Sequence, residues 1–440
     1  MLWPLTTQRT AAGALAIGGV ELAALAREYG TPLYIYDEAT LRDRCRRYRA
    51  AFAAAYPATT VVYAAKAYLS PALLAVLRDE DLWLDVVSGG ELALALRYGF
   101  PAARITFHGN NKSPDELRLA VTHDIGRIVV DNLLELERLG ALGAALGRRV
   151  PILLRLNPGV EAHTHEYRQT GVIDSKFGLP TLDDQAERAV AQALATPTLD
   201  LRGYHAHVGS QIFELAPYRE TIAALYRFAA QMRDRYGFVP TELSPGGGLA
   251  IPYTEAEEAE EAALDDLART IADAVRQETA AHALPAPHLT VEPGRSIVGP
   301  AGVALYTVGA VKDIPGVRRY VSVDGGMADN IRPALYGAAY TAALVNRDAR
   351  GEPLARVTIA GKYCESGDVL IRDIALPPLA PGDLLAVPAA GAYCLAMASN
   401  YNLALRPAVV FVRGGHARLT RRRETLDDLL CTEVMEGIED

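Results

Sequence analysis

The sequence predicts an α/β protein that combines a TIM-type (β/α)8 barrel with a second, all-β domain. Two observations lead to this prediction. Eight short runs rich in Val, Ile, Leu and Thr recur between residues 59 and 293, and each is followed by a polar or glycine-bearing turn and then by apolar residues at helical spacing. After about residue 297 the long helical stretches stop, and short apolar runs separated by turn residues follow one another.

The first part alternates strands with helices, which favours a closed parallel barrel. An open, doubly wound sheet is the alternative, but no GxGxxG motif follows the first strand. The predicted strands are TTVVYAAK (59–66), LWLDVV (82–87), RITFHG (104–109), RIVVD (127–131), PILLRLN (151–157), LRGYHAHV (201–208), PTELSP (240–245) and HLTVEP (288–293).

The later part is predicted to be a Greek-key barrel or a sandwich-like fold, because its short runs lack the helical stretches that link parallel strands. Its candidate strands lie in VALYTVGAV, RYVSVDGG, RVTIAGKY, DLLAVPAAG and PAVVFVRGG.

The composition excludes several classes of protein. The 440 residues carry 53 acidic and 44 basic side chains, a formal net charge of −9, which argues against a nucleic-acid binder. No apolar stretch reaches the roughly 20 uninterrupted residues of a membrane span. The N-terminus has Arg9 where the core of a signal peptide would lie, so we expect a cytoplasmic protein. The spacing of the cysteines predicts neither a disulfide framework nor a zinc site; they are Cys45, Cys364, Cys394 and Cys431.

In a barrel of this kind the C-terminal strand ends converge on one face, where active sites lie. Lys66 ends the first predicted strand, and burial there would favour a neutral, nucleophilic amine. A lysine that simply reaches solvent is the alternative. The eighth strand ends in VEPGRS, where Glu292 and Arg295 lie three apart across a Pro-Gly turn. A structural ion pair near the surface is the simpler interpretation of that pair.

The sixth strand carries His205 and His207 in HAHVGSQI, and strand alternation puts both on one face. Such a pair suits a metal ion, and HTHEY offers a second set, His163, His165 and Glu166. A barrel hydrolase, however, would have its HxH on the first strand and an Asp at the end of the eighth. The other interpretation makes His207 a flat ring that stacks on a planar cofactor, with Ser210 as a hydrogen-bond donor.

Glycines and a thiol complete the candidates. SPGGGLA (244–250) has three consecutive glycines, including Gly247 and Gly248, after a strand, so backbone N–H groups there can approach a phosphate. In the β region GKYCESGD places Cys364, Glu365 and Asp368 in one turn, where a free thiol is suited to donating a proton. The region also holds three further polar candidates, Arg332, Tyr336 and Tyr393.

Taken together, a buried lysine, a stacking histidine, a glycine phosphate site and a strand-end carboxylate fit one cofactor, pyridoxal 5′-phosphate. Lys66 would hold the aldehyde as a Schiff base, and Ser210 with the glycines would hold the phosphate. Glu292 would keep the pyridine nitrogen protonated, so that the ring accepts the electron pair released by bond breaking.

The same residues resemble the alanine-racemase-fold, fold-type III pyridoxal-phosphate decarboxylases, most closely the diaminopimelate decarboxylase family. The resemblance covers most of the chain and follows the family's order of motifs. The motifs are YAAKA, DVVSGGEL, HGNNKS, RLNPGVEAHTHEY, TGVIDSKFG, HAHVGSQI, GGGLAIPY, EPGRSIV, DGGMADNIRPALY, GKYCESGD and GAYCLAMASNYN. Departures from the family pattern occur at Tyr68, Pro245 and in LAI at 249–251.

The resemblance implies specific roles. Lys66 and Cys364 are then the catalytic residues, the lysine as Schiff-base former and the thiol as proton donor. Cys364 and Glu365 reach the active site of a partner subunit, which implies a homodimer. The implied cofactor-binding set is Lys66, His207, Ser210, Gly247, Gly248, Glu292, Pro293, Gly294, Arg295 and Tyr393. The implied substrate-binding set is Arg295, Arg332, Tyr336, Glu365 and Tyr393.

The resemblance also implies the domain bounds and the reaction. Residues 29–297 form the cofactor-binding barrel, and residues 1–28 join 298–440 in the β domain. The expected reaction is decarboxylation of an amino acid with a distal carboxylate, diaminopimelate, to L-lysine. Ornithine, lysine, arginine or a specialised acidic amino acid is the alternative substrate. A non-catalytic carrier of the cofactor and a metal-dependent barrel hydrolase are the alternatives from other classes.

Overall fold

The computed structural model describes residues 1–11, 13–160, 175–258 and 263–434. The chain divides into two compact units. The barrel unit comprises residues 42–250 and 260–297, and the β unit comprises residues 1–41, 251–259 and 298–440. The second histidine set of the sequence, HTHEY, lies outside the described residues.

The barrel unit contains all eight predicted strands, and they close on themselves. Each strand pairs in parallel with the next, and the last, β13, pairs with the first, β5, through Val291 and Val61. The strands are β5 (Thr59–Ala64), β6 (Trp83–Val86), β7 (Ile105–Phe107), β8 (Arg127–Val130), β9 (Val150–Asn157), β11 (Leu199–His205), β12 (Glu242–Ser244) and β13 (His288–Val291). The predicted closed barrel is thereby confirmed.

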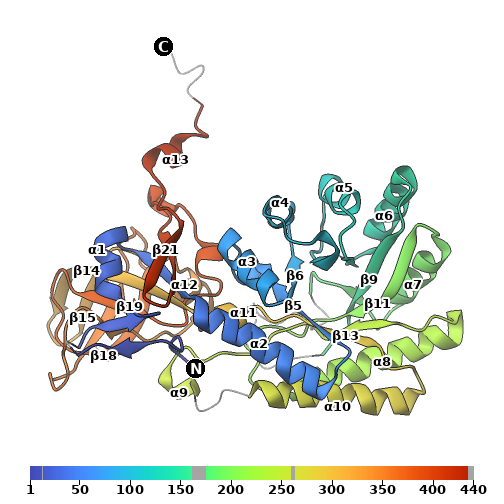
Figure 1. The fold of residues 1–440 in the computed structure, drawn as a ribbon, viewed down its shortest axis with the longest axis horizontal. Helices are drawn as coiled ribbons and strands as arrows, with labels where there is room; N and C mark the ends of the chain where they lie inside the picture. The colour runs from blue at the N-terminus through green and yellow to red at the C-terminus, as the bar shows by residue number, and fades with distance from the viewer. Residues whose placement is uncertain (12, 161–174, 259–262, 435–440) are drawn as a thin grey trace. The chain divides into compact units, whose positions relative to one another are not determined.

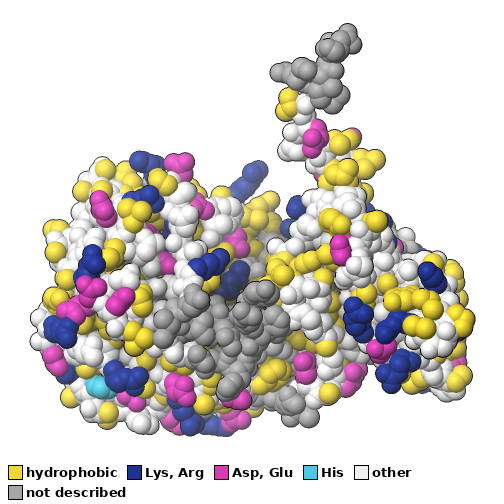
Figure 2. Space-filling view, turned by 180° about the vertical axis from the view of Figure 1, so that it is seen from behind, with side chains coloured by type: hydrophobic (Ala, Val, Ile, Leu, Met, Phe, Trp, Pro, Cys, Tyr) yellow, Lys and Arg dark blue, Asp and Glu magenta, His cyan; other side chains and the backbone are white. Residues whose placement is uncertain are grey.

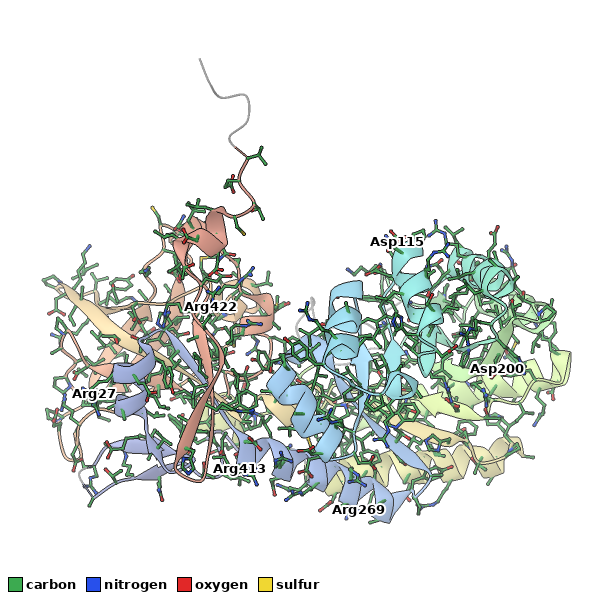
Figure 3. All side chains as sticks on the ribbon, turned by 45° about the horizontal axis from the view of Figure 1, so that its top comes forward. Arg27, Asp115, Asp200, Arg269, Arg413 and Arg422 are labelled. Atoms are coloured by element: carbon green, nitrogen blue, oxygen red, sulfur yellow. The ribbon has the colours of Figure 1, made fainter. Side chains whose placement is uncertain are left out.

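Helices surround the strands of this unit (Figure 1). The outer faces of the helices carry charged side chains, such as Asp115 and Arg269 in Figure 3. Their inner faces carry buried aliphatic side chains that pack against the strands. The strands are apolar on both sides, because parallel strands are buried on both faces. The helices are α2 (Glu38–Ala55), α3 (Pro71–Asp79), α4 (Gly89–Arg97), α5 (Pro114–Thr122), α6 (Leu133–Leu146), α7 (Gln185–Ala195), α8 (Ala216–Tyr236), α10 (Leu264–His282) and the short α11 (Arg295–Val298).

Short strand-to-helix turns determine where the strand-end side chains lie. The N-cap side chains Ser70, Ser88, Ser113 and Asn132 each accept a hydrogen bond from the backbone N–H three residues later. Ser113 and Glu116 form a full capping box at α5. Because each cap follows its strand within a few residues, the intervening polar side chains remain at the mouth of the barrel.

The β unit is built on a mixed sheet of nine strands whose main order is β18-β17-β15-β14-β4-β20-β21. The strands are β4 (Leu33–Asp37), β14 (Gly302–Ile314), β15 (Arg318–Val323), β16 (Ala343–Leu344), β17 (Ala355–Ala360), β18 (Val369–Leu376), β19 (Leu384–Val387), β20 (Ala408–Arg413) and β21 (His416–Arg421). Its helices are α1 (Leu22–Tyr29), α9 (Glu255–Glu258), α12 (Arg332–Tyr336) and α13 (Leu426–Leu430).

The N-terminal arm belongs to this unit. β1 (Gln8–Arg9), β2 (Leu15–Ile17) and β3 (Val20–Glu21) form a small sheet whose apolar residues join the same core as Val303, Leu305 and Val410. The bounds from the resemblance assigned residues 29–41 to the barrel, whereas β4 lies between β14 and β20 of the β sheet. These partners are more than 260 residues away in sequence, so no local pattern reveals the pairing.

The surface carries both signs of charge. Figure 2 shows basic and acidic side chains interspersed over the visible face. No helix in the described part of the chain is both long and apolar enough to cross a membrane.

Candidate active site

All eight barrel strands end within two residues of a polar side chain, and these side chains share the C-terminal mouth of the barrel. They are Lys66, Asp85, His108, Asp131, Asn157, His205, Ser244 and Glu292. This is the face on which barrel enzymes place their chemistry.

Glu292 is the centre of a buried hydrogen-bond network. Its Oε2 accepts from His205 Nε2 at 3.0 Å, and its Oε1 accepts from Ser244 Oγ at 2.8 Å. Burial alone would raise the pKa of this carboxyl, but the nearby His205 and His108 rings and the two hydrogen bonds hold the pKa well below its usual range. Glu292 is therefore ionised inside the protein.

A second buried carboxyl, Asp85, lies in the same network. His108 Nε2 is 3.9 Å from Asp85 Oδ1 and 3.7 Å from Glu292 Oε1. Burial, together with the nearby charge of Glu292, raises the pKa of Asp85 well above its usual range. Burial lowers the pKa of His108 well below its usual range, so its ring is neutral. Of the two neighbouring carboxyls, one keeps the negative charge and the other keeps a proton.

The glycine turn after β12 has no room for side chains. A Cβ on Gly246 would lie 2.6 Å from His207 Nδ1, and one on Gly248 would lie 2.4 Å from the carbonyl oxygen of Gly209. Both glycines also have positive φ, at 79° and 114°. The Gly247 N–H donates to His207 Nδ1 at 3.4 Å. The turn thus offers bare backbone for a phosphate, beside a histidine ring.

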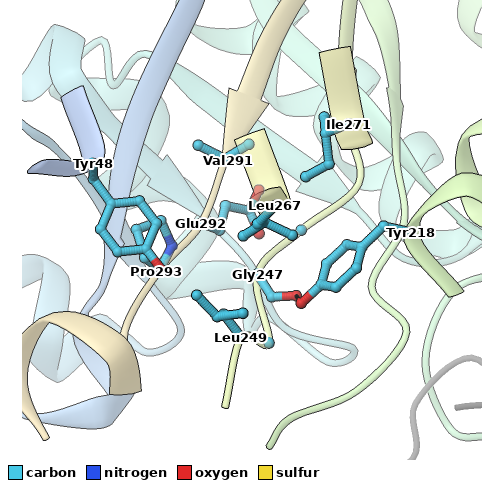
Figure 4. A pocket seen from close by; sticks show the side chains of 11 residues that line it. Tyr48, Tyr218, Gly247, Leu249, Leu267, Ile271, Val291, Glu292 and Pro293 are labelled. Atoms are coloured by element: carbon cyan, nitrogen blue, oxygen red, sulfur yellow. Dashed lines mark hydrogen bonds between the residues drawn. The ribbon is translucent and has the colours of Figure 1, made fainter. Parts of the chain in front are cut away.

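A tyrosine supports this turn from behind. Tyr218, on α8, donates its hydroxyl to the Gly247 carbonyl at 3.2 Å, and Figure 4 shows the ring pointing at the glycine. The other residues that line the small cavity behind the turn are mainly apolar, among them Leu249, Leu267 and Ile271.

Lys66 differs from its prediction in one respect. Strand β5 ends at Ala64, and Lys66 lies in the following 3-10 turn, with its side chain exposed. The expectation of a buried lysine is wrong, because this turn carries the side chain beyond the last strand residue. The position itself is as predicted: the Ala64 N–H donates to the carbonyl of Pro293, which puts Lys66 and Glu292 at adjacent strand ends.

The EPGRS segment is buried, so a surface ion pair does not describe it. Arg295 begins α11 and donates from Nη2 to Ser210 Oγ at 2.9 Å. Gly294 packs against Ala64 and Ala67, where a Cβ would come within 3.1 Å of three atoms. Ser210 and Arg295 thus lie together, as two groups that hold one phosphate must.

The β unit holds a separate buried cluster around Arg332. This side chain is 1% exposed, and its guanidinium lies 4.3 Å from the Tyr253 ring centroid and 5.3 Å from that of Tyr340. It donates from Nη1 to the Tyr340 hydroxyl, which is also 3.4 Å from Cys394 Sγ. Within the described chain its Nε and Nη2 have no hydrogen-bond partner. Two buried donors of Arg332 therefore have no acceptor among the described residues of the cluster.

The other candidates of the β unit lie in two places. Tyr336 ends α12, the helix that Arg332 begins, and Tyr393 precedes Cys394 with a positive φ of 61°. Cys364 and Glu365 lie on an exposed turn that a hydrogen bond from the Asp368 N–H to the Glu365 carbonyl closes.

Several side chains of the barrel mouth were not among the predicted site residues. Asp85, His108, Asp131, Arg155 and Ser244 are buried there. The sequence did contain a signal for them, because each lies at or near a strand end. The same criterion selected Lys66 and Glu292. The sequence pattern does not show which side chains point into the barrel and which point out, because the short strands are apolar on both faces.

The barrel residues fit pyridoxal 5′-phosphate. The cofactor needs a lysine, donors for its phosphate and a partner for its pyridine nitrogen. Lys66, the bare glycine turn with Ser210 and Arg295, and the ionised Glu292 supply these in one barrel mouth. The neutral ring of His207, whose pKa burial lowers, suits stacking on a planar group.

Comparisons with known proteins agree. Residues 38–299 match the family model described as pyridoxal-dependent decarboxylase, pyridoxal binding domain. A diaminopimelate decarboxylase of Bacillus subtilis is 49% identical over 429 residues, 98% of this chain and 97% of that protein. The crystal structure of the diaminopimelate decarboxylase from M. jannaschii with L-lysine is 32% identical, covers 100% of both chains and has a TM-score of 0.92. The corresponding Helicobacter pylori structure with L-lysine is 30% identical, covers 93% of this chain and 98% of that one, and has a TM-score of 0.84.

The family model spans more than half of the chain, and the residues of the barrel mouth fit the cofactor that its description names. The chain therefore belongs to the pyridoxal-dependent decarboxylases, and pyridoxal 5′-phosphate is its cofactor.

Proposed function

We propose that this decarboxylase converts meso-2,6-diaminopimelate to L-lysine and carbon dioxide, the last step of lysine biosynthesis. The B. subtilis relative carries this activity in its name, and two similar structures hold L-lysine. The observation that carries the proposal is Arg332, a buried cation with two N–H donors that lack partners in the described chain.

Arg332 separates diaminopimelate from related substrates. A buried, unpaired guanidinium costs stability unless a ligand supplies the anion. Diaminopimelate has a distal carboxylate, which can take two parallel hydrogen bonds from an arginine. Ornithine and lysine carry only an ammonium at that end, which a neighbouring arginine would repel. We therefore assign the distal carboxylate to Arg332 together with Arg295, and the distal ammonium to Glu365.

The remaining roles are assigned to the barrel. When bound, pyridoxal phosphate supplies an electron-poor ring that accepts the electron pair left when carbon dioxide departs. Lys66 would hold the cofactor covalently until the substrate amine takes its place. Glu292 would accept the pyridine N–H, and His207 would stack on the ring. The phosphate would be held by Ser210, Gly247, Gly248 and Arg295, with Pro293, Gly294 and Tyr393 as further cofactor contacts and Tyr336 and Tyr393 as substrate contacts.

We assign protonation of the α-carbon to Cys364 of the partner subunit in a homodimer. The β unit, in this proposal residues 298–440 with the N-terminal arm, then contributes both to the dimer interface and to the active sites. Cys364 and Glu365 lie on an exposed turn, which suits residues that act on another copy. A cytoplasmic location is part of the proposal, since all four cysteines are free thiols.

Substrate identity is tested by carbon dioxide release from meso-diaminopimelate, L-lysine and L-ornithine. We expect turnover of diaminopimelate to exceed that of the other two by about 10³-fold or more in kcat/KM, because a site built to bind one polar group rejects an analogue that lacks it. Release from ornithine or lysine but not from diaminopimelate would refute the assignment. An absorbance band near ~420 nm without any release would indicate a non-catalytic cofactor carrier.

Shared active sites are tested with two inactive variants, Lys66→Ala and Cys364→Ala, produced together in one cell. A mixed dimer then has one site with both changes and one site with neither. With random pairing in a two-fold dimer the mixture should recover about a quarter of the wild-type rate. No recovery from a preparation shown to contain mixed dimers would mean that each chain supplies its own thiol.

A further inference from the structure

Glu292 is held by two side chains from the two preceding strands of the barrel, β11 and β12. His205 ends β11, Ser244 ends β12, and the two are directly opposite each other in the parallel register. The Glu292 N–H donates to the Gly246 carbonyl at 3.0 Å, which places the carboxylate beside this pair. Each carboxylate oxygen of Glu292, a residue that is 8% exposed, therefore accepts a hydrogen bond from one of the two side chains.

We propose that His205 and Ser244 are positioning residues that keep the negative charge on Glu292 and not on Asp85, and so fix the carboxylate for the pyridine nitrogen of the cofactor. The inference rests on the role proposed for Glu292. It concerns side chains that contact neither the reacting atoms nor, in this proposal, the cofactor.

The hydrogen positions on both donors follow from their surroundings. Ser244 Oγ accepts the Gly246 N–H at 3.1 Å, so its own hydrogen is directed to Glu292. His205 is 1% exposed, and its Nδ1 has no hydrogen-bond partner in the described chain. A proton on Nδ1 would be buried without an acceptor, so a neutral ring carries it on Nε2, which faces Glu292.

The ring of His205 is also held in place. His108 packs edge-on against it, with centroids 4.8 Å apart and planes at 71°. A rotation that exchanged Nε2 for Nδ1 would have to displace this second ring. The donor to Glu292 is therefore built into the core, and no movement of a flexible side chain is needed to form it.

The alternative carboxyl, Asp85, lacks such support. Its Oδ1 has no hydrogen-bond partner in the described residues, although His108 Nε2 lies 3.9 Å away. Two carboxylates in one buried site repel each other, so the better hydrogen-bonded group keeps the charge. The charged or titratable groups that act on Glu292 and Asp85 from the surrounding elements are His205, His207, His108, Arg155, Lys66 and Glu91.

The test measures the dissociation constant of pyridoxal phosphate from pH 9 down to the lowest pH at which each protein remains folded, using the full-length protein freed of cofactor. In His205→Leu we expect binding at pH 7 to weaken about ten- to hundredfold, the effect of removing one hydrogen bond from a buried charge. Without that donor burial raises the pKa of Glu292, so the loss of affinity as the pH falls should begin at a higher pH than in wild type, and its midpoint should move up.

Three variants control this result. His205→Gln retains an N–H donor at similar reach and should restore most of the affinity. Ser244→Ala is a smaller change that should weaken binding several-fold and move the midpoint in the same direction, even if His205→Leu fails to fold. His288→Leu removes a histidine at the opposite end of β13, where it bonds to Thr60, and should bind like wild type.

Two results would overturn the inference. One is wild-type affinity and pH dependence in both His205→Leu and Ser244→Ala. The other is His205→Gln as weak as His205→Leu, which would mean that the ring only fills space. Glu292→Gln distinguishes failure of the role proposed for Glu292 from failure of the positioning role. If Glu292→Gln leaves cofactor affinity unchanged, the role of Glu292 fails as well. If Glu292→Gln weakens binding while the His205 and Ser244 variants do not, only the positioning role fails.

Discussion

Lys112 of the barrel unit and Arg332 of the β unit are equally buried cations in opposite surroundings. The Lys112 side chain is 1% exposed, and its three donors reach Glu135 Oε1 at 2.6 Å, the Val129 carbonyl at 2.7 Å and the Gly109 carbonyl at 2.8 Å. Arg332 is 1% exposed, yet two of its nitrogens have no hydrogen-bond partner in the described chain. Aromatic rings of Tyr253 and Tyr340 surround it in place of a carboxylate.

The difference separates a structural charge from a functional one. A charge whose donors are all satisfied adds no binding capacity, because nothing is left to offer a ligand. A charge that is buried with spare donors costs free energy in the empty protein and regains it when an anion binds. On this view Lys112 fixes the loop after β7, and Arg332 is held ready for a carboxylate.

The largest effect on stability is expected at the paired cation. Glu135→Leu leaves Lys112 buried without its carboxylate, and the free energy of unfolding should fall by about 3–5 kcal/mol. The measurement is urea unfolding followed by circular dichroism, on the cofactor-loaded protein.

The double variant Lys112→Met with Glu135→Leu is the matched control. It removes both charges, so most of the stability should return. A loss below about 1 kcal/mol in Glu135→Leu would contradict the contrast, because a bond to a charged group is usually worth more than that.

Much of the barrel was predictable because its signals are local. Each strand is followed by a turn and a helix, and the site candidates Lys66 and Glu292 stand at strand ends, where one strand's sequence suffices to find them. The exposure of Lys66 was not predictable, since it depends on β5 ending at Ala64. Which residues surround Glu292 was also hidden, because His205 and Ser244 meet it only when three strands pair in register.

The β unit was less predictable because its contacts are distant in sequence. β4 pairs with β14 and β20, more than 260 residues later, although its sequence LYIYD followed by a helix looks like one more barrel strand. Arg332 was a polar candidate of the β region, and its substrate-binding role came from a family resemblance. Its distinctive property, burial with spare donors, arises from Tyr253 and Tyr340, and no spacing within its own helix predicts it.

The smallest effect on stability is expected at the unpaired cation, with the opposite effect on activity. Arg332→Met keeps the volume but removes a charge whose donors are unsatisfied, so the free energy of unfolding should stay within about 1 kcal/mol of wild type or rise. The kcat/KM for diaminopimelate should fall about 10²–10³-fold, because its distal carboxylate loses its partner. Cofactor content should not change, and slow turnover of L-lysine, which has no distal carboxylate, should fall much less. If Arg332→Met instead costs 3 kcal/mol or more and leaves kcat/KM intact, the arginine is structural like Lys112, and the contrast between the two units disappears.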